Sequence, residues 1–332
     1  MDKDVVLRVE HLRKYFPIRR GLTDSILSRE RRYIRAVDDV TFSLKDGEIL
    51  GFVGESGCGK STMSRTILRL IEPTSGCVYY EDDEVTSLEK ERLKEIRRKM
   101  QMIFQDPFGS LNPRRTVADT LRQTIRIHHL VHGKVDESSL IKKTLEDVGL
   151  RPVDEFWSKY PAVLSGGQLQ RVSIGRVLVL QPRFVIADEP VSMLDVSVRI
   201  GILDLLWRMR DEFHISFLYI THDLVTARYL CDRIAIMYLG KIVEIGKTED
   251  ILSRPVHPYT QALICAVPAL DPTADAPDVP IKGYVPATPG EARNTCSFYP
   301  RCPHGLDQCG EREPQLVQVE GDHYAACPRM AF

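Results

Sequence analysis

The stretch "GESGCGKS" at residues 54–61 decides the fold of this chain, and it fits the pattern G-x-x-x-x-G-K-[ST]. An apolar segment, "ILGFV" (49–53), precedes it, and a segment with a helical pattern, "STMSRTILRL" (61–70), follows it. Glycines in such a loop let backbone N–H groups wrap around phosphate oxygens, and the start of the helix adds the positive end of its dipole. The stretch therefore predicts a strand–loop–helix unit that binds phosphate.

Within this unit, Lys60 can reach the β- and γ-phosphates of a nucleotide, and the hydroxyl of Ser61 can ligate Mg²⁺. The simpler alternative is a glycine turn beside a lysine, but the flanking strand and helix argue against it. Cys58 is interpreted as a small residue that fits the loop, with a redox role as the minor alternative. The residues predicted to contact the nucleotide are Gly54, Glu55, Ser56, Gly57, Cys58, Gly59, Lys60, Ser61 and Thr62.

A second candidate element of the phosphate site is "FVIADEP" (184–190), an apolar strand that ends in two acids. Ligands of α/β proteins bind at the carboxyl ends of parallel strands, where such acids would lie. Asp188 is predicted to hold the Mg²⁺ shell, and Glu189 to polarise the attacking water. The alternative is a pair of solvated acids at a strand end.

The composition is that of an ordinary soluble protein. Of the 332 residues, 43% are apolar and 27% are charged, and the formal net charge is −1, so no global field favours nucleic acid or an anionic membrane. No apolar run approaches a membrane span, and "MDKDVVLRVEHLRKYF" (1–16) lacks the apolar region of a signal peptide. We expect a cytosolic chain with reduced thiols and without a disulfide framework.

Strand and helix patterns alternate along the chain and predict a mainly parallel sheet covered on both faces. Further strands are predicted at "ISFLYI" (215–220) and "RIAIMY" (233–238), and "MYLGKIVEIG" reads as a hairpin that turns at Leu239 and Gly240. A solvated helix is predicted at 89–100, and a helical insertion over about 110–160. The predicted domains are 1–253, with a helical subdomain at about 108–165, and a proline-rich tail at 254–332.

"LSGGQLQR" (164–171) gives the chain a family: it resembles the ATP-binding subunits of ABC transporters, over about residues 5–250. The resemblance implies an α/β P-loop NTPase with a RecA-like core, an antiparallel β-subdomain and a helical subdomain, to which this chain adds a small cysteine-containing tail domain. By the same resemblance, Gln105 is the glutamine that ligates Mg²⁺, and His222 is the switch histidine. Tyr15 would stack on adenine, with Phe16 as the other candidate. Taken singly, all three would more often be structural residues; their order and spacing favour the functional roles.

The signature residues implied by the resemblance are Ser165, Gly166, Gly167 and Gln168, and Asp195 matches the D-loop. Two glycines open a helix here, and a helix N-terminus suits a γ-phosphate. In this family that phosphate belongs to the partner subunit's ATP, so two subunits sandwich two ATP molecules. The long basic interruption at 17–35 resembles one of two unequal ATPase types, which implies a different but related ATPase as partner.

The tail, from "RPVHPYTQALICAVP" (254–268) onward, resembles that of the ATPases for uptake of oligopeptides, dipeptides and sometimes nickel or oligosaccharides. It holds Cys296, Cys302, Cys309 and Cys327, whose spacing C-x5-C-x6-C-x17-C lacks the tight knuckles of zinc sites and the tight spacing of ferredoxins. Spacing leaves zinc and iron open, but the resemblance around "FYPRCP" implies a [4Fe–4S] cluster. His304 and His323 are alternative ligands, interpreted as surface residues.

These features favour an ATP-hydrolysing subunit of a peptide importer, peripheral on the cytoplasmic face of the cell membrane. It would act with two permease subunits, through which an extracytoplasmic binding protein acts, and with no nucleic acid. The alternatives are a soluble ABC ATPase that acts on ribosomes or DNA, an importer for oligosaccharide or nickel, and a regulatory domain without turnover.

Overall fold

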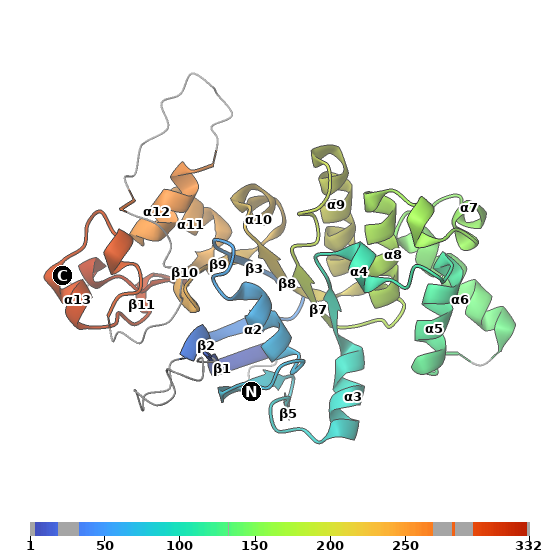
Figure 1. Cartoon of the computed structure of the whole chain (residues 1–332), viewed down its shortest axis with the longest axis horizontal. Coiled ribbons are helices and arrows are strands. Elements are labelled where there is room, and N and C mark those ends of the chain that lie inside the picture. The colour runs from blue at the N-terminus through green and yellow to red at the C-terminus, as the bar shows by residue number, and fades with distance from the viewer. Residues whose placement is uncertain (1–3, 19–32, 132, 268–280, 283–294, 331–332) are drawn as a thin grey trace, which may run out of the picture. The chain divides into compact units, whose positions relative to one another are not determined.

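The computed structural model describes residues 4–18, 33–131, 133–267, 281–282 and 295–330. It divides into two compact units, and Figure 1 traces the whole chain. The first unit holds residues 1–44, 50–87 and 220–332, and the second holds 45–49 and 88–219. Most of the basic interruption at 17–35 lies outside the described residues. No helix in the described ranges is long and apolar enough to cross a membrane.

The first unit contains a four-stranded sheet of order β2-β1-β4-β5. Its strands are β1 (Val5–Pro17), β2 (Tyr33–Lys45), β4 (Ser75–Tyr80) and β5 (Asp83–Glu84). β1 pairs antiparallel with β4, in a register that places Leu7 opposite Tyr80. Leu7, Val9 and Val78 are fully buried, so alternate residues of these strands form one side of a core. β4 and β5 were not predicted as strands from the sequence.

The remaining strands of this unit run in the order β11-β12-β10-β9-β3. β3 pairs parallel with β9, and β9 pairs antiparallel with β10 through a hairpin at Leu239 and Gly240, as predicted. Both turn residues have positive φ, 44° and 85°, which is the geometry of a tight two-residue hairpin turn. The strands are β3 (Ile49–Val53), β9 (Arg233–Tyr238), β10 (Lys241–Lys247), β11 (Val317–Glu320) and β12 (His323–Ala325).

The tail therefore contributes two of these strands, because β12 pairs antiparallel with β10 and β11 pairs with β12. The backbone N–H of Ala326 continues the pairing with a bond to the Val243 carbonyl at 2.8 Å. The helices of the first unit are α2 (Lys60–Ile67), α10 (Leu224–Leu230), α11 (Thr248–Ser253), α12 (Pro258–Cys265) and α13 (Asp307–Glu311).

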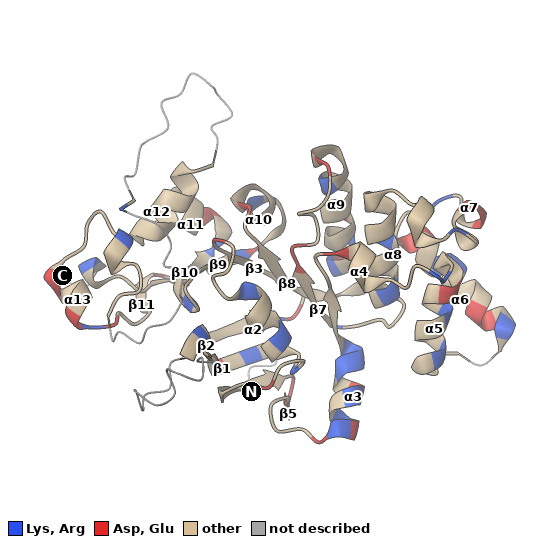
Figure 2. Cartoon of the chain, viewed as in Figure 1, with Lys and Arg blue, Asp and Glu red and all other residues tan. Residues whose placement is uncertain are grey.

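The second unit contains strands in the order β8-β7-β6, with β7 parallel to β6. They are β6 (Met100–Ile103), β7 (Phe184–Asp188) and β8 (Ser216–Thr221). Every residue of β7 and β8 is buried, as expected for strands covered on both faces. The predicted solvated helix is α3 (Lys90–Lys99): only Leu93 and Ile96 are buried, and much of its ribbon is coloured blue, for Lys and Arg, in Figure 2.

The helical insertion predicted in this unit is present. It consists of α5 (Val117–Ile127), α6 (Lys134–Asp147) and α7 (Val153–Trp157), all in mutual contact. α5 and α6 also pack against α8 (Gly166–Leu178), which in turn contacts α9 (Val196–Phe213). A short helix, α4 (Pro107–Ser110), packs against α8 as well. The insertion thus positions the helix that begins at the predicted signature.

Candidate functional site

The loop at residues 54–59 is shaped by its glycines. Gly57 and Gly59 have φ of 79° and 108°, values that side chains with a Cβ rarely adopt. A Cβ on Gly59 would lie 1.9 Å from the carbonyl oxygen of Ala36, and one on Gly54 would lie 2.2 Å from that of Met237. The loop thus packs against two backbone segments with no room for a side chain at either glycine. α2 begins at Lys60 immediately after it, as predicted.

Lys60 bridges the ends of this loop. Its side chain is buried, and Nζ donates hydrogen bonds to the carbonyl oxygens of Gly54 at 2.6 Å and Glu55 at 3.0 Å. Burial raises the pKa of the neighbouring Cys58 thiol despite the lysine. A thiol held protonated is a poor nucleophile, so the interpretation of Cys58 as a fitting small residue is the better one. Ser61 and Thr62 lie half-buried in the first turn of α2.

Tyr15, the candidate for adenine, lies near the end of β1 and is half-buried. Its hydroxyl donates to Asp38, and the Arg35 guanidinium lies 5.3 Å from the ring centroid. Burial and the Asp38 hydrogen bond raise the pKa of Tyr15 to about 12. Lys14 lies 5.0 Å from the ring centroid of Phe16, the alternative candidate. Each ring therefore has a cation near one face.

In the second unit, the structure brings together two of the predicted catalytic residues. The Gln105 side-chain amide donates to Oε2 of Glu189 at 2.9 Å and lies 3.4 Å from the Ser192 hydroxyl. Glu189 follows Asp188, the last residue of β7, which is buried. Glu189 has φ of 46°, an uncommon backbone conformation for a residue other than glycine. Such strain is typical of functional sites.

The predicted signature begins α8 with a capping box. The Ser165 hydroxyl accepts from the Gln168 backbone N–H at 3.3 Å, and the Gln168 side chain accepts from the Ser165 N–H at 3.0 Å. Ser165 is exposed, while a Cβ on Gly167 would lie 2.4 Å from a methyl carbon of Val198. This close approach holds the start of α8 against α9. Asp195 is exposed at the N-terminal end of α9 and makes no side-chain capping bond.

His222 is exposed and follows directly after β8, and Asp223 caps α10 by accepting from the Val225 N–H at 2.8 Å. His222 belongs to the first unit, with the phosphate loop and Tyr15. Gln105, Asp188, Glu189, Asp195 and the signature residues belong to the second.

The four tail cysteines are free thiols, and all are buried. The Cys296 N–H donates to the Cys309 carbonyl at 2.9 Å. Burial raises the pKa of Cys296 to about 11, and it raises the pKa of Cys302 and Cys327, with contributions from Cys309. The thiols are thus close enough to interact. Among the described residues, however, no group of three or more Cys, His, Asp or Glu side chains is arranged to hold a metal ion.

One interpretation of the tail histidines was wrong. His304 is exposed, but His323 is 5% exposed, and its Nε2 lies 2.7 Å from Oε1 of Glu244. Glu244 itself is fully buried on β10 and also accepts from the backbone N–H groups of Val256 at 2.8 Å and His257 at 2.9 Å. His323 is therefore a structural residue that links β12 to β10. No sequence pattern identified Glu244 as its partner.

The sequence reasoning also missed that tail residues contact the phosphate loop. Arg301 forms two bonds to the Glu55 carboxylate, at 3.0 and 3.2 Å, and the Tyr259 hydroxyl accepts from the Glu55 N–H at 3.0 Å. All three residues belong to the first unit. Arg301 lies inside "FYPRCP" and Tyr259 inside "HPYT", two stretches that carry the family resemblance of the tail. Nothing in these stretches indicates that either residue contacts Glu55.

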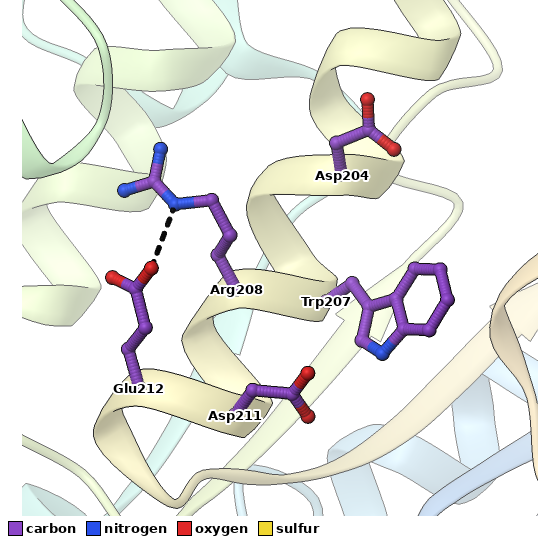
Figure 3. Close-up of a pocket in the computed structure, with 5 residues that line it drawn as sticks. All are labelled: Asp204, Trp207, Arg208, Asp211 and Glu212. Carbon is purple, nitrogen blue, oxygen red and sulfur yellow. Dashed lines mark ion pairs between the residues drawn. The ribbon is translucent and has the colours of Figure 1, made fainter.

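A surface hollow on α9 takes its walls from one helix and shares no residue with the candidate site (Figure 3). Arg208 and Glu212 form an ion pair there at 3.4 Å. Because both partners are about half exposed, this pair contributes little to stability. The residues that line the hollow are Asp204, Trp207, Arg208, Asp211 and Glu212.

Comparison with known proteins places the chain in a family. Residues 37–192 match the ABC transporter model, and residues 243–309 match the model of the oligopeptide/dipeptide transporter C-terminal region. The chain belongs to the ABC transporter family, as one of its ATP-hydrolysing subunits. Its C-terminal region makes it one of the oligopeptide/dipeptide type.

Two relatives cover almost the whole chain. The oligopeptide transport ATP-binding protein AppF of Bacillus subtilis is 40% identical over 98% of both chains. The probable peptide ABC transporter ATP-binding protein y4tS of Sinorhizobium fredii is 43% identical, over 98% of this chain and 90% of its own. Among solved structures, the dimeric post-hydrolysis state of the ATP-binding cassette MJ0796, bound to ADP and Pi, is 29% identical with a TM-score of 0.63. It covers 73% of this chain and 98% of its own.

Proposed function

We propose that this chain hydrolyses ATP to drive the import of short peptides through a membrane permease. The relatives named for peptide and oligopeptide transport support this cargo, and they span nearly all of this chain. The observation that supports the ATPase mechanism is that two helices begin at the two motifs, because a helix N-terminus suits an anion. One follows the phosphate loop at Lys60, and the other is capped at Ser165.

In the proposed mechanism, the loop N–H groups and Lys60 bind the phosphates of this chain's own ATP. Lys60 would exchange its bonds to the Gly54 and Glu55 carbonyls for phosphate oxygens. Ser61, Gln105 and Asp188 would hold Mg²⁺, which neutralises charge that develops on the phosphates. Glu189 would orient and polarise the attacking water, and its bond to Gln105 would keep the carboxylate in position. His222 would stabilise the γ-phosphate, and Tyr15 would stack on adenine.

The start of α8 would contact ATP held by a second ATPase subunit, a related but different chain. Apolar side chains around Asp195 support an interface there, because Met193, Val196 and Ile200 are 58%, 73% and 57% exposed. The chain would lie on the cytoplasmic face of the membrane, bound to two permease subunits. A separate extracytoplasmic protein would deliver the peptide to these permeases.

Affinity purification of the tagged chain from detergent-solubilised membranes tests this proposal. We expect a second ATPase and two integral-membrane proteins, identified by mass spectrometry. We also expect that ATP hydrolysis by the purified complex rises when its binding protein is supplied with a peptide. Recovery of ribosomes or DNA in place of the membrane proteins would support the soluble alternative. If an oligosaccharide or nickel stimulates ATP hydrolysis and peptides do not, the proposed peptide cargo is wrong.

The tail is further proposed to hold a [4Fe–4S] cluster on Cys296, Cys302, Cys309 and Cys327, with zinc as the alternative. Four buried thiols in one short region have the donor chemistry that such a cluster requires. Their described arrangement does not form a metal-binding group, so no step of the mechanism depends on the cluster.

Iron, zinc and acid-labile sulfide should be measured on anaerobically purified protein. About four iron and four sulfide per chain are expected for this cluster type. Cys309→Ser should lose the iron and sulfide. Cys265→Ser, at a half-buried cysteine that is not one of the four proposed ligands, should keep them. One zinc per chain without sulfide would contradict the proposed [4Fe–4S] cluster and leave the ATPase proposal intact.

A further inference from the structure

Glu55 is the first variable residue of the phosphate loop, and three of its groups are bound. Its carbonyl oxygen accepts from Lys60, its N–H donates to the Tyr259 hydroxyl, and its carboxylate binds Arg301 through two guanidinium nitrogens. Two of these three connections come from the C-terminal region. The conformation of the loop at this residue therefore depends on side chains 204 and 246 positions away in the sequence.

Both tail residues are buried beside the aromatic rings of Tyr238 and Phe298. Tyr259 is fully buried in α12, and its ring lies 4.7 Å from that of Tyr238 and 5.4 Å from that of Phe298, measured between centroids. Arg301 has a side chain that is 9% exposed, and its guanidinium lies 5.7 Å from the Tyr238 ring centroid and 5.9 Å from that of Phe298. A planar guanidinium held in this way presents a fixed two-nitrogen fork to the carboxylate.

The chain leading to Arg301 is also fixed. The backbone N–H of Arg301 donates to the Phe298 carbonyl at 2.9 Å, and the Arg301 carbonyl accepts from the backbone N–H of Lys282 at 3.0 Å. Burial lowers the pKa of Arg301, but the hydrogen bonds with Glu55 and Tyr238 outweigh it and the net shift is upward. The guanidinium therefore stays charged in its buried position, where it can neutralise Glu55.

The charge on Glu55 gives this contact a consequence for nucleotide binding. ATP and ADP bring several negative charges to a loop that already contains one carboxylate. An unpaired carboxylate there would repel the phosphates, whereas a carboxylate neutralised by a buried guanidinium would not.

We propose that Arg301 and Tyr259 are positioning residues of the phosphate loop. Arg301 neutralises and fixes the Glu55 side chain, and Tyr259 fixes its backbone, so the C-terminal region sets the affinity of the loop for nucleotide. The inference rests on the phosphate-binding role proposed above for residues 54–62. It assigns to the C-terminal region a direct effect on the ATP site of the same chain.

The test is ADP binding by the full-length chain, measured by calorimetry, so that hydrolysis and dimerisation do not enter. Arg301→Gln should raise the Kd about tenfold, and Arg301→Lys should raise it less, because the lysine keeps the charge but not the fork. The defect of Arg301→Gln should shrink in 1 M salt, because ions screen the repulsion. Arg312→Gln, at an exposed tail arginine, is the matched control and should bind like the unaltered chain.

The decisive variant is the double substitution Glu55→Gln with Arg301→Gln. It removes the unpaired carboxylate, so ADP affinity should return to within about threefold of that of the unaltered chain. A loss of affinity that merely reflects a misfolded tail would not be rescued. If the double variant binds as weakly as Arg301→Gln, or if Arg301→Gln binds normally, the proposal is wrong. Lys60→Ala distinguishes failure of this proposal from failure of the proposed phosphate-binding role of residues 54–62. If Lys60→Ala binds ADP normally, the phosphate-binding role itself is wrong.

Discussion

The buried carboxyl of Glu244 predicts a large effect from a small substitution, Glu244→Gln. Oε1 accepts from the Val256 N–H and interacts with His323, and Oε2 accepts from the His257 N–H. Glutamine has one oxygen and one NH₂ group in place of the two oxygens. If its oxygen occupies the Oε1 position, its NH₂ group faces the His257 N–H, and two donors are opposed.

The cost can be estimated bond by bond. One buried N–H without an acceptor costs about 1–3 kcal/mol. Two remaining bonds change from a carboxylate to a neutral amide acceptor, and each loses about 1 kcal/mol. The free energy of unfolding should therefore fall by about 3–5 kcal/mol, which lowers Tm by about 6–20 °C for a unit of this size. The substitution keeps the volume of the side chain, so a cavity does not contribute.

The assay is thermal unfolding followed by circular dichroism, together with hydrogen exchange of the amides of Val256 and His257. Exchange at these two amides should accelerate in the variant, because they lose or weaken their acceptor. Glu320→Gln is the matched control. Its carboxylate is 73% exposed and pairs with Arg254 at 3.0 Å, so Tm should change by less than about 2 °C. Equal shifts in the two variants would refute the reasoning.

Three further predictions concern the candidate site and the tail. Glu189→Gln should reduce ATP hydrolysis by the assembled complex at least a hundredfold while ATP stays bound; unchanged turnover in a phosphate-release assay would favour the regulatory alternative. Gly54→Ala should weaken ADP binding more than tenfold, because the new Cβ would lie 2.2 Å from the Met237 carbonyl and displace the loop; normal affinity by calorimetry would contradict this. Burial lowers the pKa of His257 from its ordinary 6.5 to about 3, so the unfolded chain binds a proton that the folded chain does not, and stability should fall as the pH drops from about 6.5 towards 3. In His257→Asn, where the amide oxygen can still cap α12, this part of the pH dependence of Tm should disappear.

The elements that the sequence predicted correctly have strong local signals. β7 and β9 are continuous apolar runs, and the hairpin at Leu239 and Gly240 has its turn glycine in place. The start of α2 follows from the glycine loop, and its position agrees with the structure. In each case a few adjacent residues determine the local backbone, so no distant partner was needed for the prediction.

The elements that were missed depend on distant partners. β12 is only three residues long, and it becomes a strand because the β10 edge supplies hydrogen-bonding groups. His323 was interpreted as a surface residue, since nothing near it in the sequence suggests that it pairs with Glu244, 79 residues earlier. The contact of Arg301 with Glu55 spans an even longer separation. Local patterns do not contain such pairings.

The pairing of β12 with β10 also bears on solubility. β10 contains Ile242, Val243 and Ile245, all nearly buried, so a chain cut before the tail would present an apolar strand with unpaired N–H and C=O groups. Such an edge is a template for association with other chains. The tail replaces it with β11, "VQVE", three of whose four residues are exposed. Residues 317–326 thus cover an edge of the sheet that would otherwise be open to association with other chains, whether or not the tail holds a metal.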